Sequence, residues 1–229
     1  MMPHTDRAYE ADLGKISNLV SHMGGQLEDI LEGAERSLQE RNAVLARHTI
    51  EVDRNINRAE LNVDSLCMQV LARRQPVASD LRFVMTVLKL VTDLERIGDL
   101  AKNVCERVIE LADVPRRVTD AKLLEMMSGA RSMVRAAVKA FIERDVAAAE
   151  EVRTRDDRID HLYHEVLREI LAQMTEDPQT IFEATRLQST AKNIERIGDH
   201  ATNVAEMIVF MVKGEDVRHR TSGSIVEAV

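Results

Sequence analysis

The sequence predicts an all-α fold made of two tandem, pseudo-symmetric three-helix bundles. Three observations lead to this prediction: a composition suited to helices, an internal repeat, and helix-ending signals at matching places in each copy. Hydrophobic residues make up 45% of the 229 residues, but aromatic residues only 3%, and there is no Trp. Ala, Leu, Val, Glu, Arg and Met supply the bulk instead, and this composition favours helices over a β-sandwich.

The internal repeat is read from two segments that lie 100 residues apart. Residues 95–106 and 195–206 share nine of their twelve residues, including Glu-Arg-Ile-Gly-Asp at the start of each. Ordinary residue usage would match about one position in fifteen, so the similarity indicates a duplication. Upstream, residues 40–44 correspond to residues 143–147 at an offset of 103. The first copy is therefore three residues longer, and we place the extra residues in the loop that contains Pro76.

Capping residues mark the ends of the predicted helices. Asn42 and Asp145 occupy matched positions and are good N-cap residues. Asp177 followed by Pro178 is typical of an N-cap with proline at the first helical position. Gly214 is expected to end the last helix. The six predicted helices cover approximately residues 8–40, 43–74, 78–112, 119–142, 146–175 and 179–213.

Each predicted helix carries one apolar stripe, and three such stripes can close a small bundle. Pro115 lies between the two copies, so we predict one bundle over residues 1–114 and a second over residues 115–229. In the second helix the stripe consists of Val52, Ile56, Ala59, Val63, Leu66 and Val70. In the fourth it consists of Met126, Met127, Ala130, Met133, Val134, Ala137 and Phe141.

Charge and cysteine content narrow the class of protein. The formal net charge is -8, from 39 acidic and 31 basic residues, which argues against a nucleic-acid-binding protein. Cys67 and Cys105 form no Cys-x-x-Cys pair, and a reducing cytoplasm suits them best. The N-terminus shows no secretory signal, and the longest apolar run, Met207 to Val212, is too short to span a bilayer. We therefore expect a cytoplasmic protein that meets membranes only peripherally, through its partners.

Acidic residues form a row on the third helix of each copy. Glu95, Asp99 and Asn103 follow one another at four-residue steps and are expected to share one side of their helix. Towards the N-terminus the same side is continued by apolar residues from Val84 to Val91, so the carboxylates prolong a core stripe. The second copy repeats this row with Glu195, Asp199 and Asn203.

The second helix of each copy supplies a matching acidic set. Asp53, Asn57, Glu60 and Asp64 share a side that flanks the apolar stripe, and Asp156 and Asp160 repeat the first two positions. Oxygen ligands from two helices can converge on a hard cation, and unpaired carboxylates without a cation would repel one another. The candidate metal is Mg²⁺, Mn²⁺, Ca²⁺, Zn²⁺ or iron. The candidate metal-binding residues are Glu95, Asp99, Asn103, Asp53, Asn57, Glu195, Asp199, Asn203, Asp156 and Asp160.

A purely structural interpretation of these rows competes with the metal hypothesis. Arg96 and Arg196 directly follow the two glutamates and can pair with the acidic residues. Gly98 and Gly198 occupy the same place in both copies, although glycine inside a helix costs about 0.5–1 kcal/mol relative to alanine. Close packing of a neighbouring helix is our first explanation of these glycines, and room for a bound ion is the second.

The sequence lacks the usual signatures of an enzyme. It contains no Glu-x-x-His, the motif of ferritin-like di-iron bundles, and no Gly-rich phosphate-binding loop. No arrangement of nucleophile and base can be argued either. We expect a non-enzymatic protein, and keep as alternatives a carboxylate-bridged metal-dependent enzyme on a helical bundle and a purely structural helical scaffold.

With these features the chain resembles the PhoU family of regulators of bacterial phosphate-specific transport. The resemblance is carried by the segments Arg74–Arg82, Asp93–Asp99, Ile194–Asp199 and Val212–His219. It implies two three-helix bundles, a cytoplasmic location and a homodimer. It also implies a negative regulator of phosphate uptake and of the phosphate-starvation response, with two partners: a sensor histidine kinase and the ATPase subunit of the phosphate ABC transporter.

The resemblance further implies metal binding through paired acidic residues. Those pairs correspond here to Glu95 with Asp99, Glu195 with Asp199, and Asp156 with Asp160. In the first copy, the equivalent of the pair Asp156 with Asp160 is Asp53 with Asn57, so an amide replaces one carboxylate. An amide oxygen can still bind a metal, but the two sites are then not equivalent.

Overall fold

The computed structural model describes residues 4–118 and 121–217, and this part of the chain consists of helices and their connections, with no strand. The all-α prediction is therefore confirmed. The predicted start of the fourth helix at residue 119, and the residues Arg218 and His219 of the last matching segment, lie outside the described residues. The elements are α1 (His4–Glu40), α2 (Ala43–Val52), α3 (Arg54–Arg74), α4 (Ala78–Leu111), α5 (Ala121–Glu143), α6 (Val146–Glu176), η1 (Pro178–Thr180) and α7 (Ile181–Lys213).

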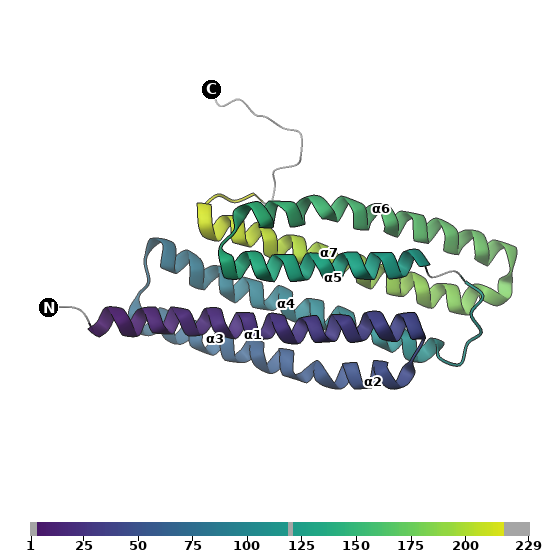
Figure 1. Ribbon diagram of the computed structural model, residues 1–229, viewed down its shortest axis with the longest axis horizontal. Helices are drawn as coiled ribbons and strands as arrows, with labels where there is room; N and C mark the ends of the chain where they lie inside the picture. The colour runs from purple at the N-terminus through teal and green to yellow at the C-terminus, as the bar shows by residue number, and fades with distance from the viewer. Residues whose placement is uncertain (1–3, 119–120, 218–229) are drawn as a thin grey trace, which may run out of the picture.

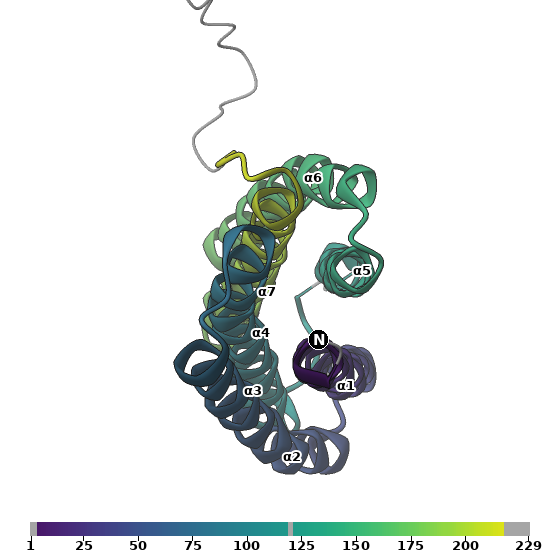
Figure 2. The same cartoon turned by 90° about the vertical axis from the view of Figure 1, so that its left-hand side faces the viewer.

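The helices run along the length of an elongated molecule (Figure 1). Seen end-on, α2, α3, α4, α7 and α6 form one curved layer, and α1 and α5 lie on its concave side (Figure 2). One bundle consists of α1 to α4 and the other of α5 to α7, and they meet where α4 packs along α7 and α1 packs against α5. The predicted boundary at residue 114 falls in the connection between α4 and α5, and the separate folding of residues 1–114 and 115–229 stays a prediction.

The predicted caps are found at the helix ends. The side chain of Asn42 accepts hydrogen bonds from the amides of Val44 and Leu45, at 3.1 and 3.0 Å. Asp145 accepts one from the amide of Ala148 at 3.1 Å. Gly214 ends α7 in the left-handed conformation, with φ of 77°, which glycine adopts without steric cost. Each cap satisfies backbone groups that a helix end leaves without an intrahelical partner.

Two predicted helices differ in detail from the structure. The helix expected over residues 43–74 is divided at Asp53 into α2 and α3, although Asp53 itself keeps helical dihedral angles (φ -53°, ψ -33°). The amide of Ile56 bonds the carbonyl of Asp53, a three-residue step that tightens the chain at this point. The helix expected from residue 179 begins as the 3₁₀ turn η1, where Asp177 caps the amide of Gln179.

The predicted apolar stripes form the core. Ile56, Val63 and Val70 are buried, while Val52, Ala59 and Leu66 pack against the core from partly exposed positions. The whole stripe predicted for the fourth helix is buried in α5. On α4, Val84, Val87, Leu90, Val91 and Leu94 are buried as well, while Met85 is exposed and Leu88 is only partly buried. Among the described helices none is long and apolar enough to cross a membrane.

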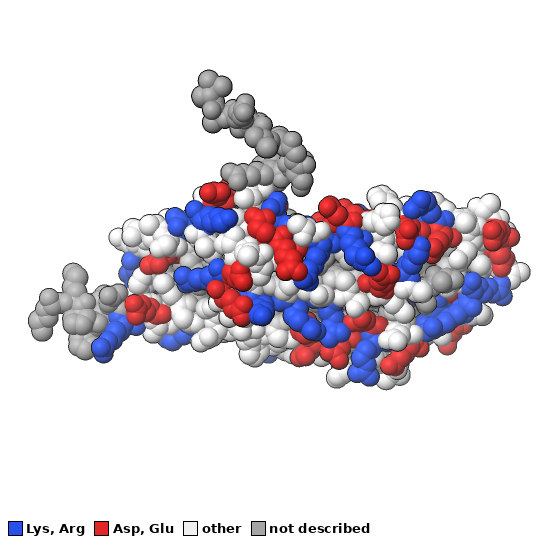
Figure 3. All heavy atoms as spheres, turned by 45° about the horizontal axis from the view of Figure 1, so that its top comes forward, with Lys and Arg blue, Asp and Glu red and all other residues white. Residues whose placement is uncertain are grey.

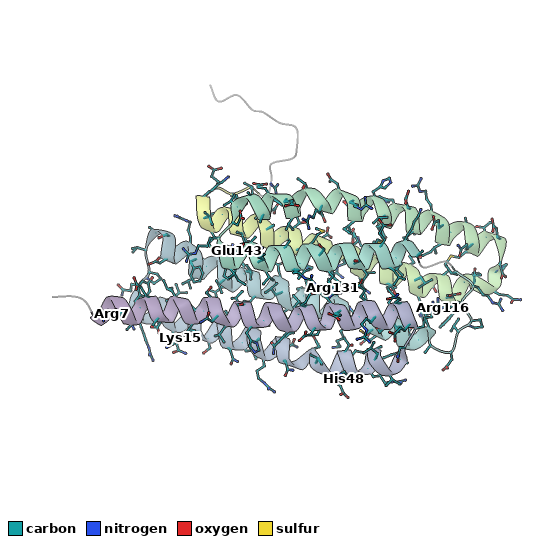
Figure 4. The ribbon with its side chains drawn as sticks, viewed as in Figure 1. Arg7, Lys15, His48, Arg116, Arg131 and Glu143 are labelled. Carbon is teal, nitrogen blue, oxygen red and sulfur yellow. The ribbon has the colours of Figure 1, made fainter. Side chains whose placement is uncertain are left out.

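Ion pairs join the two bundles on the α1–α5 side. Arg131 of α5 lies over α1 (Figure 4) and donates to Glu28, Glu32 and Glu35 at 2.8, 2.9 and 2.7 Å. Over the face shown in Figure 3, acidic and basic side chains alternate rather than separating into fields of one sign. This face therefore presents no large field of a single charge.

A buried ion pair joins the bundles at the connection between them. Arg41 at the end of α1 donates to Glu183 in the first turn of α7, and their side chains are only 5% and 1% exposed. The other carboxylate oxygen of Glu183 accepts from the backbone amides of Arg117 and Val118, at 2.9 and 3.1 Å. The carboxylate of Glu183 thus connects the start of α7 to the end of α1 and to the segment between the two bundles.

Candidate metal sites in two acidic clusters

Acidic side chains gather at two equivalent places, once in each bundle. The first acidic cluster lies between α3 and α4 and consists of Asp53, Glu60, Asp64, Glu95 and Asp99. The second acidic cluster lies between α6 and α7, and it consists of Asp156, Asp160, Glu195 and Asp199. The predicted convergence of carboxylates from two helices is therefore found in both copies.

The second acidic cluster brings three carboxylates within reach of one ion. Oxygen atoms of Asp160, Glu195 and Asp199 all lie within 4.8 Å of one another. Asp160 and Asp199 are exposed, while Glu195 is half-buried. Asp156 lies deeper, and its buried Oδ1 atom has no hydrogen-bond partner. The cluster thus combines an accessible triad with a deeper oxygen that lacks a donor.

This arrangement makes negative charge costly in the second cluster. Burial raises the pKa of Asp156 to about 6, and the charges of Asp199 and Asp160 add to the effect. Burial, Glu195 and Asp160 likewise raise the pKa of Asp199. Lys192 pairs with Glu195 at 2.6 Å but lies on the exposed rim. The buried part of the cluster therefore favours a proton or another cation.

The first acidic cluster already contains a cation beside its buried carboxylate. Asp53 is only 4% exposed, and the Lys102 ammonium lies 3.8 Å from its Oδ2 atom. Burial raises the pKa of Asp53, with Lys102 opposing the shift and Asp99 supporting it. The other oxygen, Oδ1, has no hydrogen-bond partner, so Lys102 compensates this carboxylate only in part.

The exposed part of the first cluster is crowded with acids and has one nearby guanidinium. Burial raises the pKa of Glu95, and the charges of Asp99 and Glu60 raise it further. Arg96 lies 3.8 Å from Glu95 and 3.9 Å from Asp99, on the outer side of α4. The structural pairing expected for Arg96 is thus present, but both contacts are long for hydrogen bonds.

The two glycines in the acidic motifs make room for the buried aspartates. A Cβ atom at Gly98 would lie 3.2 Å from Oδ1 of Asp53, and one at Gly198 would lie 3.2 Å from Oδ1 of Asp156. These are the same oxygens that lack hydrogen-bond partners. Close approach of the neighbouring helix, our first explanation of the glycines, is confirmed. Room for a bound ion stays a prediction.

Among the described residues, three of the predicted ligands form no hydrogen bond or ion pair with the acidic residues of their clusters. Asn203 is exposed and donates to Asp93 on α4 at 3.4 Å, away from the second cluster. Asn57 is exposed and Asn103 is partly exposed, and no hydrogen bond or ion pair among the described residues joins either to the first cluster. For Asn103 and Asn203 the reason is geometric, since four residues turn a helix by about 400° and each step drifts by about 40°. Two steps after Glu95, the side of the helix has changed. This reason does not apply to Asn57, whose equivalent Asp160 belongs to the second cluster.

Sequence reasoning missed a contact that joins the two repeats. His200 Nδ1 lies 2.7 Å from Asp93 Oδ1, between α7 and α4. The equivalent of His200 in the first copy is Leu100, and the equivalent of Asp93 in the second is Asn193. These two departures from the repeat could have predicted the contact. Polar differences inside an otherwise identical motif indicate positions at which the two copies have different surroundings.

Comparison with known proteins identifies the family. The PhoU domain model matches the chain twice, over residues 20–108 and 123–208. The chain belongs to the PhoU family. The two matches coincide with the two copies of the repeat.

Relatives of similar length support the assignment. The phosphate-specific transport system accessory protein PhoU homologue of Pseudomonas putida is 38% identical over 219 residues, covering 94% of this chain and 85% of that protein. The Escherichia coli K12 protein PhoU of the same system is 34% identical over 216 residues, covering 94% and 90%.

Solved structures share the fold. PhoU from Pseudomonas aeruginosa superposes with a TM-score of 0.88 at 36% identity, covering 90% of this chain and all of that one. The phosphate transport system regulatory protein PhoU from Streptococcus pneumoniae gives 0.85 at 25% identity, covering 91% and 99%. The two tandem bundles predicted from the sequence are therefore the fold of this family.

Proposed function

We propose that this chain is a non-enzymatic regulator that restrains phosphate uptake and represses the phosphate-starvation response. In this proposal it relays the state of the phosphate ABC transporter, through the ATPase subunit, to a sensor histidine kinase. The supporting observation is family membership along nearly the whole chain, with relatives named accessory or regulatory proteins of phosphate transport. We further propose a cytoplasmic homodimer that contacts the membrane only through these partners.

The acidic clusters are proposed as cation sites. Their side chains offer oxygen atoms alone, which favours Mg²⁺, Mn²⁺ or iron over Zn²⁺, an ion that proteins usually bind through histidine and cysteine. The buried oxygens of Asp53 and Asp156 that lack partners fit this role. Because Lys102 already lies beside Asp53, we expect the second cluster to bind cations more tightly than the first.

Deletion of the gene tests the regulatory proposal. We expect a deletion strain to express a phosphate-starvation reporter at high phosphate, and the wild-type gene to restore repression. Purified chain should also bind the ATPase subunit and the kinase, which co-purification at high and low phosphate can measure. Normal repression in the deletion strain would contradict the proposed function.

Metal binding is tested by elemental analysis of matched variants. The variant Glu195→Gln with Asp199→Asn should lose metal from the second cluster, whereas Asp157→Asn, an exposed neighbour on α6, should keep it. Equal metal content in all three proteins would rule out the second cluster as a site. If the acidic variants repress normally while losing metal, the metal serves structure rather than signalling.

The two alternative functions predict different results. A carboxylate-bridged metal-dependent enzyme should show oxidase or hydrolase activity after loading with Fe²⁺ or Mn²⁺, and that activity should vanish in the Glu195→Gln variant. A purely structural scaffold should tolerate both cluster variants and the loss of metal without any change in the reporter. Sedimentation analysis of the purified chain tests the proposed homodimer.

A further inference from the structure

A groove lies between α4 and α7, the two helices along which the bundles meet. It contains a hollow of about 490 Å³ and a smaller one of about 60 Å³, which adjoin because both are lined by Lys89 and Met207. We call it the central groove. Its apolar wall consists of Met85, Leu88, Met207 and Phe210.

The duplication provides an internal comparison for this wall. At an offset of 100 residues, the four apolar residues of the wall correspond to polar or charged residues on the same two helices, α4 and α7. Among these equivalent residues, Glu110 of α4 pairs with Arg107 at 2.9 Å and also with Arg186 of α7, so an ion pair joins the two helices. The corresponding residues are Thr185, Gln188, Arg107 and Glu110. The shared fold therefore does not require an apolar wall, and the wall of the central groove needs another explanation.

The charges in the central groove leave one cation unpaired. Asp93 is engaged by His200 and Asn203, and Glu206 lies 3.5 Å from Arg153. Asp216, at the end of the smaller hollow, also has a partner. Lys89, in contrast, is exposed and forms no ion pair with any described residue. The groove thus presents an apolar wall with a single free ammonium group.

We propose that the central groove binds an amphipathic helix of a partner protein. The helix would place apolar side chains at positions i, i+3 or i+4, and i+7 against the wall, and a carboxylate beside Lys89. The groove follows α4 over eight residues, from Met85 to Thr92, which is a rise of about 10 Å and two helical turns. Such a length suits helix-in-groove recognition, and the two flexible methionines can adapt to the side chains of a partner.

The inference rests on the proposed function, because the partner helix would belong to the ATPase subunit or to the sensor kinase. The decisive variant carries Met85→Thr with Leu88→Gln and so copies the equivalent residues of the second repeat. The matched control carries Thr185→Met with Gln188→Leu. Met85 is 42% exposed, so the first variant should fold, which circular dichroism checks. Lys89→Glu, at an exposed residue, gives an independent test that leaves the core untouched.

Affinities for the purified ATPase subunit and the purified cytoplasmic part of the kinase are then measured by biolayer interferometry. We expect the groove variant and Lys89→Glu to bind one of these proteins about ten-fold more weakly, while the control and Lys89→Arg stay within about two-fold of wild type. A photo-crosslinking amino acid at position 85 should link to a helix of the same protein.

Two outcomes separate this inference from the proposed function. If wild-type chain binds a partner and the groove variants bind equally well, the inference alone is wrong. If wild-type chain binds neither protein, the proposed function fails and the inference fails with it. Crosslinks from position 85 to residues 218–229, or to a second copy of this chain, would also overturn the inference, because the groove would then have a different occupant.

Discussion

Replacing Asp156 by asparagine should stabilise the metal-free protein near neutral pH. Asparagine keeps the shape of the side chain and removes its charge. The pKa of Asp156 is raised from 3.8 to about 6, chiefly by burial and then by Asp199 and Asp160. The folded state therefore holds this proton more tightly than the unfolded state, and stability falls as the pH rises from about 4 to about 6. Above about pH 6 the folded wild type bears the full free-energy cost of an ionised Asp156, whereas the variant has no charge at this position and bears no such cost.

The size of the effect follows from the pKa change. A rise from 3.8 to about 6 corresponds to about 3 kcal/mol. Asp156 is only half-buried, so solvent screening reduces the expected gain to about 1–2 kcal/mol. At about pH 4 both side chains are uncharged, and the two proteins should unfold with nearly equal free energies.

Urea denaturation in the presence of EDTA, followed by far-ultraviolet circular dichroism between about pH 4 and pH 8, measures this difference. Asp157→Asn removes an exposed carboxylate from the same helix that adds least to the pKa of Asp156, and as the control it should differ from wild type far less than Asp156→Asn does. Added Mn²⁺ should stabilise the wild type more than the Asp156→Asn variant, since a cation offsets the same charge. An Asp156→Asn protein that is less stable than wild type at about pH 7.5 in EDTA would refute the reasoning.

Three further substitutions test the packing of the helices, each by urea unfolding. Asn42→Ala should cost about 1 kcal/mol, because two amides of α2 lose their cap, and Asn42→Asp should restore it. Glu183→Ala should cost about 3–5 kcal/mol, since the buried Arg41 loses this carboxylate; a loss below about 1 kcal/mol would contradict that role. Gly33→Ala should cost about 1–3 kcal/mol, because its Cβ would lie 2.4 Å from Thr49 Oγ1, and Thr49→Ala should relieve the crowding.

The fold could be predicted because its signals are local. Helical periodicity shows which side of each helix is apolar, and the caps at Asn42, Asp145 and Gly214 require only neighbouring residues in the chain. The duplication added a second copy of several of these signals, such as the N-caps at Asn42 and Asp145. The break at Asp53 was not visible, because the sequence around it favours a continuous helix. Burial of the aspartate does not explain the break, because the equivalent Asp156 approaches Gly198 in the same way and lies in the uninterrupted helix α6.

The candidate site was predicted in part. The pairing of acidic rows from two helices follows from periodicity, and Glu95, Asp99, Glu195 and Asp199 all lie in the clusters. Asn203 does not, because helical drift turns it towards the other bundle. Contacts such as this depend on how α4 packs along α7, which residue spacing within one helix cannot reveal.

The positions of the lysines distinguish the two clusters more sharply than the acidic residues do. Lys102 of the first copy corresponds to Thr202, and Thr92 corresponds to Lys192. The first copy therefore has its ammonium beside the buried aspartate, and the second has its ammonium on the exposed rim, bonded to Glu195. With the same glycine and the same buried carboxylate in both copies, this exchange leaves Asp156 beside the hydroxyl of Thr202 rather than beside an ammonium group. After the duplication, the two copies thus kept the glycine and the buried aspartate but diverged in the charges around them.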